Sequence, residues 1–83
     1  MKFDCEQMDI ICTISVVLKK VPYTYNQCGV SVFWDSIDGV LIVDFEKREM
    51  QFTDWKHTQD EIYFQLLGVC HVFSLKSEDY ITK

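Results

Sequence analysis

The sequence predicts a small, mainly β fold: an antiparallel meander or partly open barrel of about five to seven strands. Strand-forming residues dominate, apolar and polar residues alternate in several segments, and two short polar segments divide the middle of the chain into three. The chain has 83 residues, of which 48% are hydrophobic and 25% are charged. Because so short a chain buries little core, we expect one domain spanning residues 1–83.

The first quarter predicts one long strand. Apolar residues alternate with other residues along residues 10–18, and residues 2–6 predict a short strand before it. Residues 19–29 contain the single proline and predict a surface loop that carries Tyr23 and Tyr25.

The middle of the chain predicts a three-stranded meander. The strands are expected at residues 30–34, 40–45 and 50–55, with turns at Asp38-Gly39 and at residues 46–49. These turns pair Trp34 with Val43 and Phe45 with Met50, and residues opposite each other share a face. The predicted apolar face contains Val30, Val32, Trp34, Leu41, Val43, Phe45, Met50 and Phe52.

The last quarter allows two interpretations. A hairpin that turns at Leu67-Gly68 gathers apolar residues on one face, and we prefer it because β-branched and aromatic residues are abundant there. The alternative is an α+β fold with one helix near residues 59–67 packed on the sheet, because Thr58 and Glu61 have the spacing of a capping box. Residues 77–83 are expected to form a polar tail.

The negative charge is concentrated in the middle of the chain. The whole chain has a formal charge of -5, and all of that excess falls in residues 35–61, where eight carboxylates face three basic side chains. Binding to nucleic acid is disfavoured, because phosphate contacts need clustered lysine and arginine. An acidic strip can instead occupy a basic groove on another protein.

The second face of the meander combines acids with large apolar side chains, a mixture typical of protein interfaces. The sequence therefore predicts a small acidic protein-binding module without enzymatic activity, an inhibitor or immunity-type factor for a basic partner that handles nucleic acid. The predicted partner-binding residues are Asp35, Asp44, Glu46, Glu49, Phe33 and Trp55.

Three alternatives stay open. The first strand or the last segment could cover Phe33, Ile42 and Trp55 and close a barrel, which would leave the acids as simple solvated groups. Such a barrel could bind a small ligand beside Tyr23 and Tyr25. The chain could also form a homo-oligomer through an exposed strand edge.

No catalytic, metal or cofactor site is predicted. Asp54, His57 and Asp60 form the best local titratable set, but no serine or cysteine nucleophile lies beside them in sequence. The four cysteines, Cys5, Cys12, Cys28 and Cys70, lack the close pairs of a zinc site and are expected to be reduced. Residues 35–39 fit a turn better than a calcium loop, because Ile37 occupies the third position.

The N-terminal region predicts neither export nor membrane insertion. Asp4, Glu6 and Asp9 precede the first apolar stretch, where a secretory signal needs a basic start followed by an apolar run. That stretch is about half the length needed to cross a bilayer. We therefore expect a cytoplasmic protein.

Overall fold

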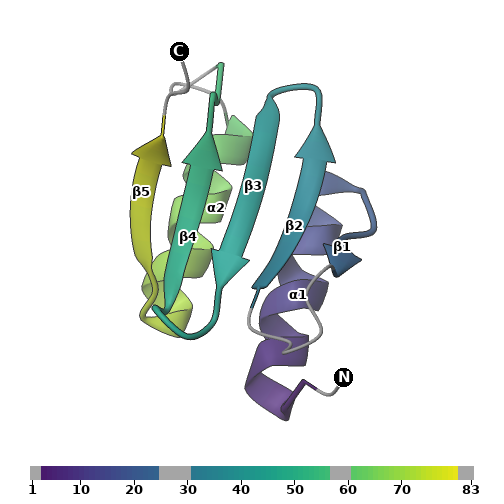
Figure 1. The fold of residues 1–83 in the computed structure, drawn as a ribbon, viewed down its shortest axis with the longest axis vertical. Coiled ribbons are helices and arrows are strands. Elements are labelled where there is room, and N and C mark those ends of the chain that lie inside the picture. The colour runs from purple at the N-terminus through teal and green to yellow at the C-terminus, as the bar shows by residue number, and fades with distance from the viewer. Residues whose placement is uncertain (1–2, 25–30, 57–60, 81–83) are drawn as a thin grey trace.

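The protein is an α+β fold in two layers. The computed structural model describes residues 3–24, 31–56 and 61–80. The elements are α1 (Cys5–Leu18), β1 (Tyr23–Thr24), β2 (Ser31–Ser36), β3 (Gly39–Asp44), β4 (Glu49–Thr53), α2 (Glu61–Phe73) and β5 (Lys76–Tyr80). Both helices lie against one face of a single sheet, whose strand order is β1-β2-β3-β4-β5 (Figure 1).

The first helix replaces the predicted long strand. Asp4 caps α1 by accepting a hydrogen bond from the Gln7 backbone at 2.8 Å, and the Gln7 side chain accepts one from the Asp4 backbone at 3.0 Å. This capping box is what the strand prediction overlooked. The prediction for residues 10–18 is wrong because the buried residues, Ile10, Ile11 and Ile14, follow helical spacing and face the sheet.

The helix ends at Lys19, whose left-handed backbone, with φ 56°, turns the chain toward β1. The short strand predicted at the start of the chain is also wrong where the structure describes it, because Cys5 already belongs to α1. Ser15 links the helix to the sheet: its Oγ donates to the Ile11 carbonyl and accepts from Trp34 Nε1 at 3.3 Å.

The predicted meander is confirmed as β2, β3 and β4, but both predicted registers are wrong by two residues. Trp34 pairs with Leu41, and Val43 pairs with Met50. The first turn is Ile37-Asp38, and residues 45–48 form the second. Because side chains alternate with period two, a shift of two residues keeps the residues within the three strands on their predicted faces.

The last quarter contains a helix and a strand. The preferred hairpin is wrong, and the alternative of a helix packed on the sheet is confirmed, although α2 extends further than residues 59–67. Leu66, Val69 and Cys70 are its buried residues, and their spacing follows the helical period rather than alternation. Within the expected polar tail, residues 77–80 instead belong to β5, and residues 81–83 lie outside the described residues. β5 pairs in parallel with β4, with Glu49 opposite Lys76.

The core lies between the sheet and the helix layer. The predicted apolar face supplies seven of its buried residues: Val32, Trp34, Leu41, Val43, Phe45, Met50 and Phe52. Val30, the eighth predicted member, lies outside the described residues. The helices contribute further buried residues: Ile10, Ile11 and Ile14 from α1, and Leu66, Val69 and Cys70 from α2. Leu75, in the connection from α2 to β5, is also buried.

The sheet is open, so the antiparallel meander of the predicted fold class is confirmed and the alternative of a closed barrel is wrong. Its edge strands are β1 and β5, which lie at opposite ends of the strand order (Figure 1). The two helices cover the apolar face of the sheet, so the sheet does not have to close into a barrel to bury that face. Among the residues that the structure describes, no helix has the length and apolar character required to span a membrane.

Candidate partner-binding face

The candidate site is the sheet face opposite the helices, here called the open face. Residues paired across the strands share a face, and neighbours of the buried core residues point the other way. The open face therefore carries Tyr23, Ser31, Phe33, Asp35, Val40, Ile42, Asp44, Glu49, Gln51, Thr53, Lys76, Glu78 and Tyr80. Four carboxylates and one ammonium group make this face acidic.

The β1–β2 side of the open face is aromatic and aliphatic. Tyr23 stacks on Phe33 with ring centroids 5.1 Å apart and an interplanar angle of 24°. Ile42 lies opposite Phe33 on the next strand, and Val40 lies opposite Asp35. Phe33, Ile42 and Val40 are only partly buried, and Tyr23 is 59% exposed. The face thus presents large apolar side chains to solvent beside a carboxylate.

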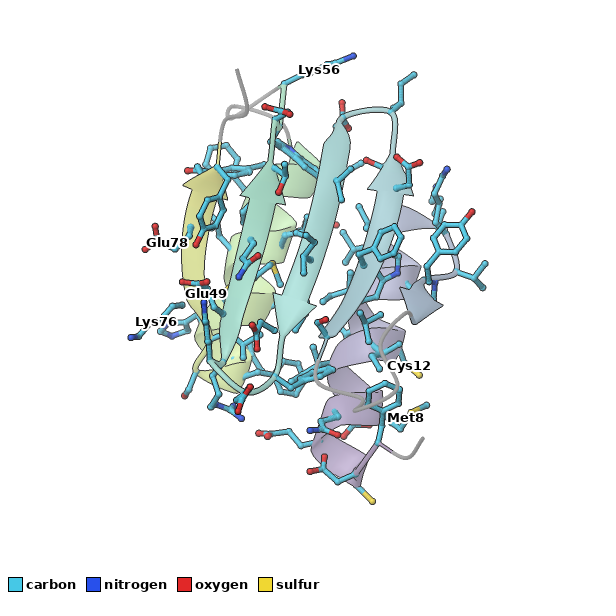
Figure 2. All side chains as sticks on the ribbon, in the orientation of Figure 1. Met8, Cys12, Glu49, Lys56, Lys76 and Glu78 are labelled. Atoms are coloured by element: carbon cyan, nitrogen blue, oxygen red, sulfur yellow. The ribbon has the colours of Figure 1, made fainter. Side chains whose placement is uncertain are left out.

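The β4–β5 side of the open face is polar. Figure 2 shows Glu49, Lys76 and Glu78 close together at this edge. The parallel pairing sets Glu49 beside Lys76 and Gln51 beside Glu78. Gln51 and Tyr80 both donate hydrogen bonds to Glu49 Oε1, at 2.8 and 3.3 Å.

The predicted acids divide into two groups by what they contact. Asp44 Oδ1 accepts hydrogen bonds from the backbones of Glu46 and Lys47, at 3.0 and 3.1 Å, so it stabilises the turn after β3. Glu49 is engaged by Gln51 and Tyr80. Asp35 is exposed, and its carboxylate makes no hydrogen bond or ion pair with the other described residues. Its carboxylate is therefore available to a partner.

Glu46 does not lie on a strand. It is exposed in the turn of residues 45–48, at the end of the sheet where β3 meets β4. Next to it, Arg48 pairs with Glu6 at 3.0 Å and donates a hydrogen bond to the Phe73 carbonyl at 2.6 Å. This arginine ties the turn to both helices.

Trp55 does not lie on the open face, so the prediction that it shares this face with Phe33 is wrong. Asp54 has a left-handed backbone with φ 53°, which ends the alternation that would have kept Trp55 on the same side as Thr53. The indole turns to the core and meets Phe52 edge-on, with ring centroids 5.3 Å apart. Its Nε1 is buried and has no hydrogen-bond partner among the described residues.

Sequence reasoning missed the contribution of β5. Every second residue of β5 lies on the open face: Lys76, Glu78 and Tyr80. This spacing of two residues is the signal in the sequence that could have placed them on one face. Glu78 is exposed, and its carboxylate makes no hydrogen bond or ion pair with other described residues. It therefore joins Asp35 as an acid open to a partner.

The pKa values of Tyr80 and Cys70, one on the sheet and one packed against it, are shifted from their ordinary values. Desolvation, followed by the charge of Glu49 and the hydrogen bond to it, raises the pKa of Tyr80. Burial raises the pKa of the Cys70 thiol to about 11. Cys70 lies beside Met50, Sγ to Sδ 3.5 Å, so it packs as a small apolar residue and is protonated at neutral pH.

Only one member of the predicted titratable set lies among the described residues. Asp54 follows β4, whereas His57 and Asp60 lie outside the described residues. His71 is exposed near the end of α2. Within residues 3–24, 31–56 and 61–80, no three histidine, cysteine or acidic side chains come together as a metal site. Cys5 and Cys12 are exposed free thiols, and Cys28 is outside the described residues.

Comparison with known proteins adds no relative. No protein-family model, no curated protein and no solved structure matches this chain.

Proposed function

We propose that this protein is a small acidic binding module that docks its open face onto a basic surface of another protein. The observation that supports this most is a sheet face left uncovered by the helices, with partly buried apolar side chains at one side and unengaged carboxylates along it. The partner that we propose is a protein whose groove carries lysine and arginine, because charge complementarity favours that pairing.

Two kinds of residue on this face would contribute to binding in different ways. Phe33, with Ile42 beside it, supplies the apolar anchor, because large side chains that become fully desolvated carry most of the affinity of an interface. Asp35 and Glu78 steer the partner at a distance, since neither is committed to a contact within the protein. Glu49 and Asp44 contribute charge while holding local structure.

The partner class we propose is a protein that handles nucleic acid. A groove that binds phosphates presents clustered positive charge, and an acidic sheet face can fill such a groove as an inhibitor or immunity-type factor. Association is then fast at low salt and weakens as salt rises, because screening acts on long-range attraction.

The test compares two charge reversals that change the net charge equally. The variant Asp35→Lys with Glu78→Lys reverses the open face, and the matched control Asp9→Lys with Glu61→Lys reverses acids on the two helices. Each immobilised variant is exposed to a lysate of the native host at low and at moderate salt, and captured proteins are identified.

The expected result is a basic protein retained by the natural chain and the helix control but lost from the open-face variant. Circular dichroism checks that both variants fold. Capture that survives the open-face reversal, or that is lost equally in both variants, would refute docking through this face. A captured partner without basic character would refute the proposed chemistry.

A further inference from the structure

A hollow of about 640 Å³ lies at the end of α1, beside β1 and the outer part of β2. Its lining includes Ser15, Val16, Lys19, Lys20, Tyr23 and Asp35. Most of these residues are outside the proposed partner-binding set. Ligand sites commonly occupy hollows of about 300–1,000 Å³, so the space is sufficient for a small organic molecule.

The charge of the hollow is opposite to that of the protein. Lys19 and Lys20 are exposed and form no ion pair with other described residues, whereas Asp35 supplies the single carboxylate of the lining. The carbonyl end of α1 adds about half a negative charge. Two ammonium groups exceed these opposing charges, so the hollow is locally positive within a chain of net charge -5.

The hollow also has an aromatic wall. One face of the Tyr23 ring stacks on Phe33, and the side chain is still 59% exposed. Val16 and Val21, which are 74% and 83% exposed, add apolar surface on either side. Apolar side chains so exposed gain from contact with a ring, because that contact removes them from water.

We propose that this hollow binds a small aromatic anion, a flat ring that carries a phosphate or carboxylate group. The anionic group lies between the ammonium groups of Lys19 and Lys20, and the ring packs against Tyr23 between the two valines. Asp35 weakens the binding of any anion, because its carboxylate lines the same hollow.

The first experiment separates charge from ring with simple probes. The full ¹⁵N-labelled chain is titrated with phenyl phosphate, benzoate, inorganic phosphate and benzyl alcohol, and amide shifts are followed by NMR. Phenyl phosphate or benzoate should bind at least about tenfold more tightly than inorganic phosphate or benzyl alcohol, because each control lacks one of the two contacts. Shifts should centre on Lys19 to Tyr23.

The second experiment uses variants with opposite expected effects. Lys19→Ala with Lys20→Ala should weaken the binding of phenyl phosphate, by about fivefold for each charge removed near the surface, and Asp35→Asn should strengthen it by a similar factor. The matched control, Lys47→Ala with Lys76→Ala, removes two lysines elsewhere and should leave affinity unchanged. Tyr23→Leu should reduce phenyl phosphate to the affinity of inorganic phosphate.

Several results would overturn the proposal. Equal shifts with inorganic phosphate and phenyl phosphate would show ion binding without a ring site. Weakening by the control pair would show a general charge effect. Weakening by Asp35→Asn would contradict the placement of the anion in the hollow that Asp35 lines. Failure of any probe to shift the Lys19 to Tyr23 amides at millimolar concentration would exclude the site. None of these outcomes bears on docking through the open face, where Asp35→Lys with Glu78→Lys is the decisive change.

Discussion

The two faces of the sheet are built from the same three central strands, yet they differ in almost every physical property. On the helix side, Val32, Trp34, Leu41 and Val43 are completely buried. On the open face, their immediate neighbours Phe33, Ile42 and Asp44 are only partly buried. Alternation along each strand therefore separates a dry core from an acidic surface by a single residue step.

This difference shows that apolar character alone does not identify the core. Phe33 and Ile42 are as apolar as their buried neighbours, but no helix covers them. What assigns a side chain to the core is its register and the layer that packs above it. The apolar residues on the open face therefore remain partly accessible to solvent.

The largest expected effect on stability is that of Leu41→Ala, compared with Ile42→Ala at the next residue, whose side chain lies on the opposite face of the sheet. Leu41→Ala should lower the free energy of unfolding by about 2–5 kcal/mol, because it leaves a cavity in the core. Ile42→Ala, one residue along the same strand, should cost about 1 kcal/mol or less, because its side chain keeps contact with solvent. Urea denaturation followed by tryptophan fluorescence measures both values. Equal losses would mean that something covers the open face.

The two glycines in the described residues should respond to alanine with opposite signs. Gly39 has φ 143°, and an added Cβ would lie 2.8 Å from the Thr53 carbonyl oxygen, so Gly39→Ala should destabilise the β2–β3 turn by about 1–3 kcal/mol. Gly68 lies inside α2 with open space around it, so Gly68→Ala should stabilise by about 0.5–1 kcal/mol. Thermal unfolding compares the two variants, and a stabilising Gly39→Ala would contradict the turn geometry.

The buried and exposed cysteines should differ in the ionisation and reactivity of their thiols. The Cys70 thiol has a pKa of about 11 in the folded protein against an ordinary 9.0, because burial disfavours the thiolate. Its contribution to stability is therefore complete below pH 9.0 and is lost as the pH rises through about 11. Cys70→Ala should flatten this alkaline decline in urea midpoints.

A thiol reagent gives a second measure at neutral pH. In a Cys28→Ser background, Cys5 and Cys12 should be modified quickly because they are exposed, and Cys70 only after unfolding. Mass spectrometry of the modified protein over time identifies each site. Rapid labelling of Cys70 in the folded chain would show that the core at α2 opens readily.

The smallest expected effect lies at the polar edge of the open face. Glu49 raises the pKa of Tyr80 through its charge and its hydrogen bond, acting together with desolvation. Glu49→Gln should therefore move the pKa of Tyr80 down toward 10.0. Ultraviolet difference titration measures the change, with Asp9→Asn on α1 as a control. A pKa that rises in Glu49→Gln would contradict the parallel pairing of β4 with β5.

The two faces of the meander were predictable because their assignment does not change when the strand register shifts by two residues. The sequence predicts Asp38-Gly39 as the first turn, whereas Ile37-Asp38 forms it, yet the strand residues lie on their predicted faces. A shift of two residues preserves the face, whereas a shift of one would exchange the faces. Asp35, Asp44 and Glu49 therefore lie on the open face as predicted. Glu46 lies in the turn after β3, and Trp55 leaves the open face because the left-handed Asp54 breaks the alternation.

The helices were harder to predict because their segments fit both periods. Ile10 and Ile14 belong to an alternating series and also to a helical face, so the apolar pattern alone could not decide between them. The capping box from Asp4 to Gln7 was the decisive local signal for α1. At α2, β-branched residues favoured strands, but packing of Leu66, Val69 and Cys70 over the sheet outweighed that preference.

The parallel pairing of β5 with β4 has a consequence for synthesis on the ribosome. The β2, β3 and β4 strands are joined by short turns and can pair as soon as they emerge, whereas β5 reaches β4 only after all of α2 has been made. Until then, the backbone groups of β4 that later bond to β5 remain open to other chains. Nascent chains that stall before Lys76 are therefore the species most exposed to wrong strand pairing.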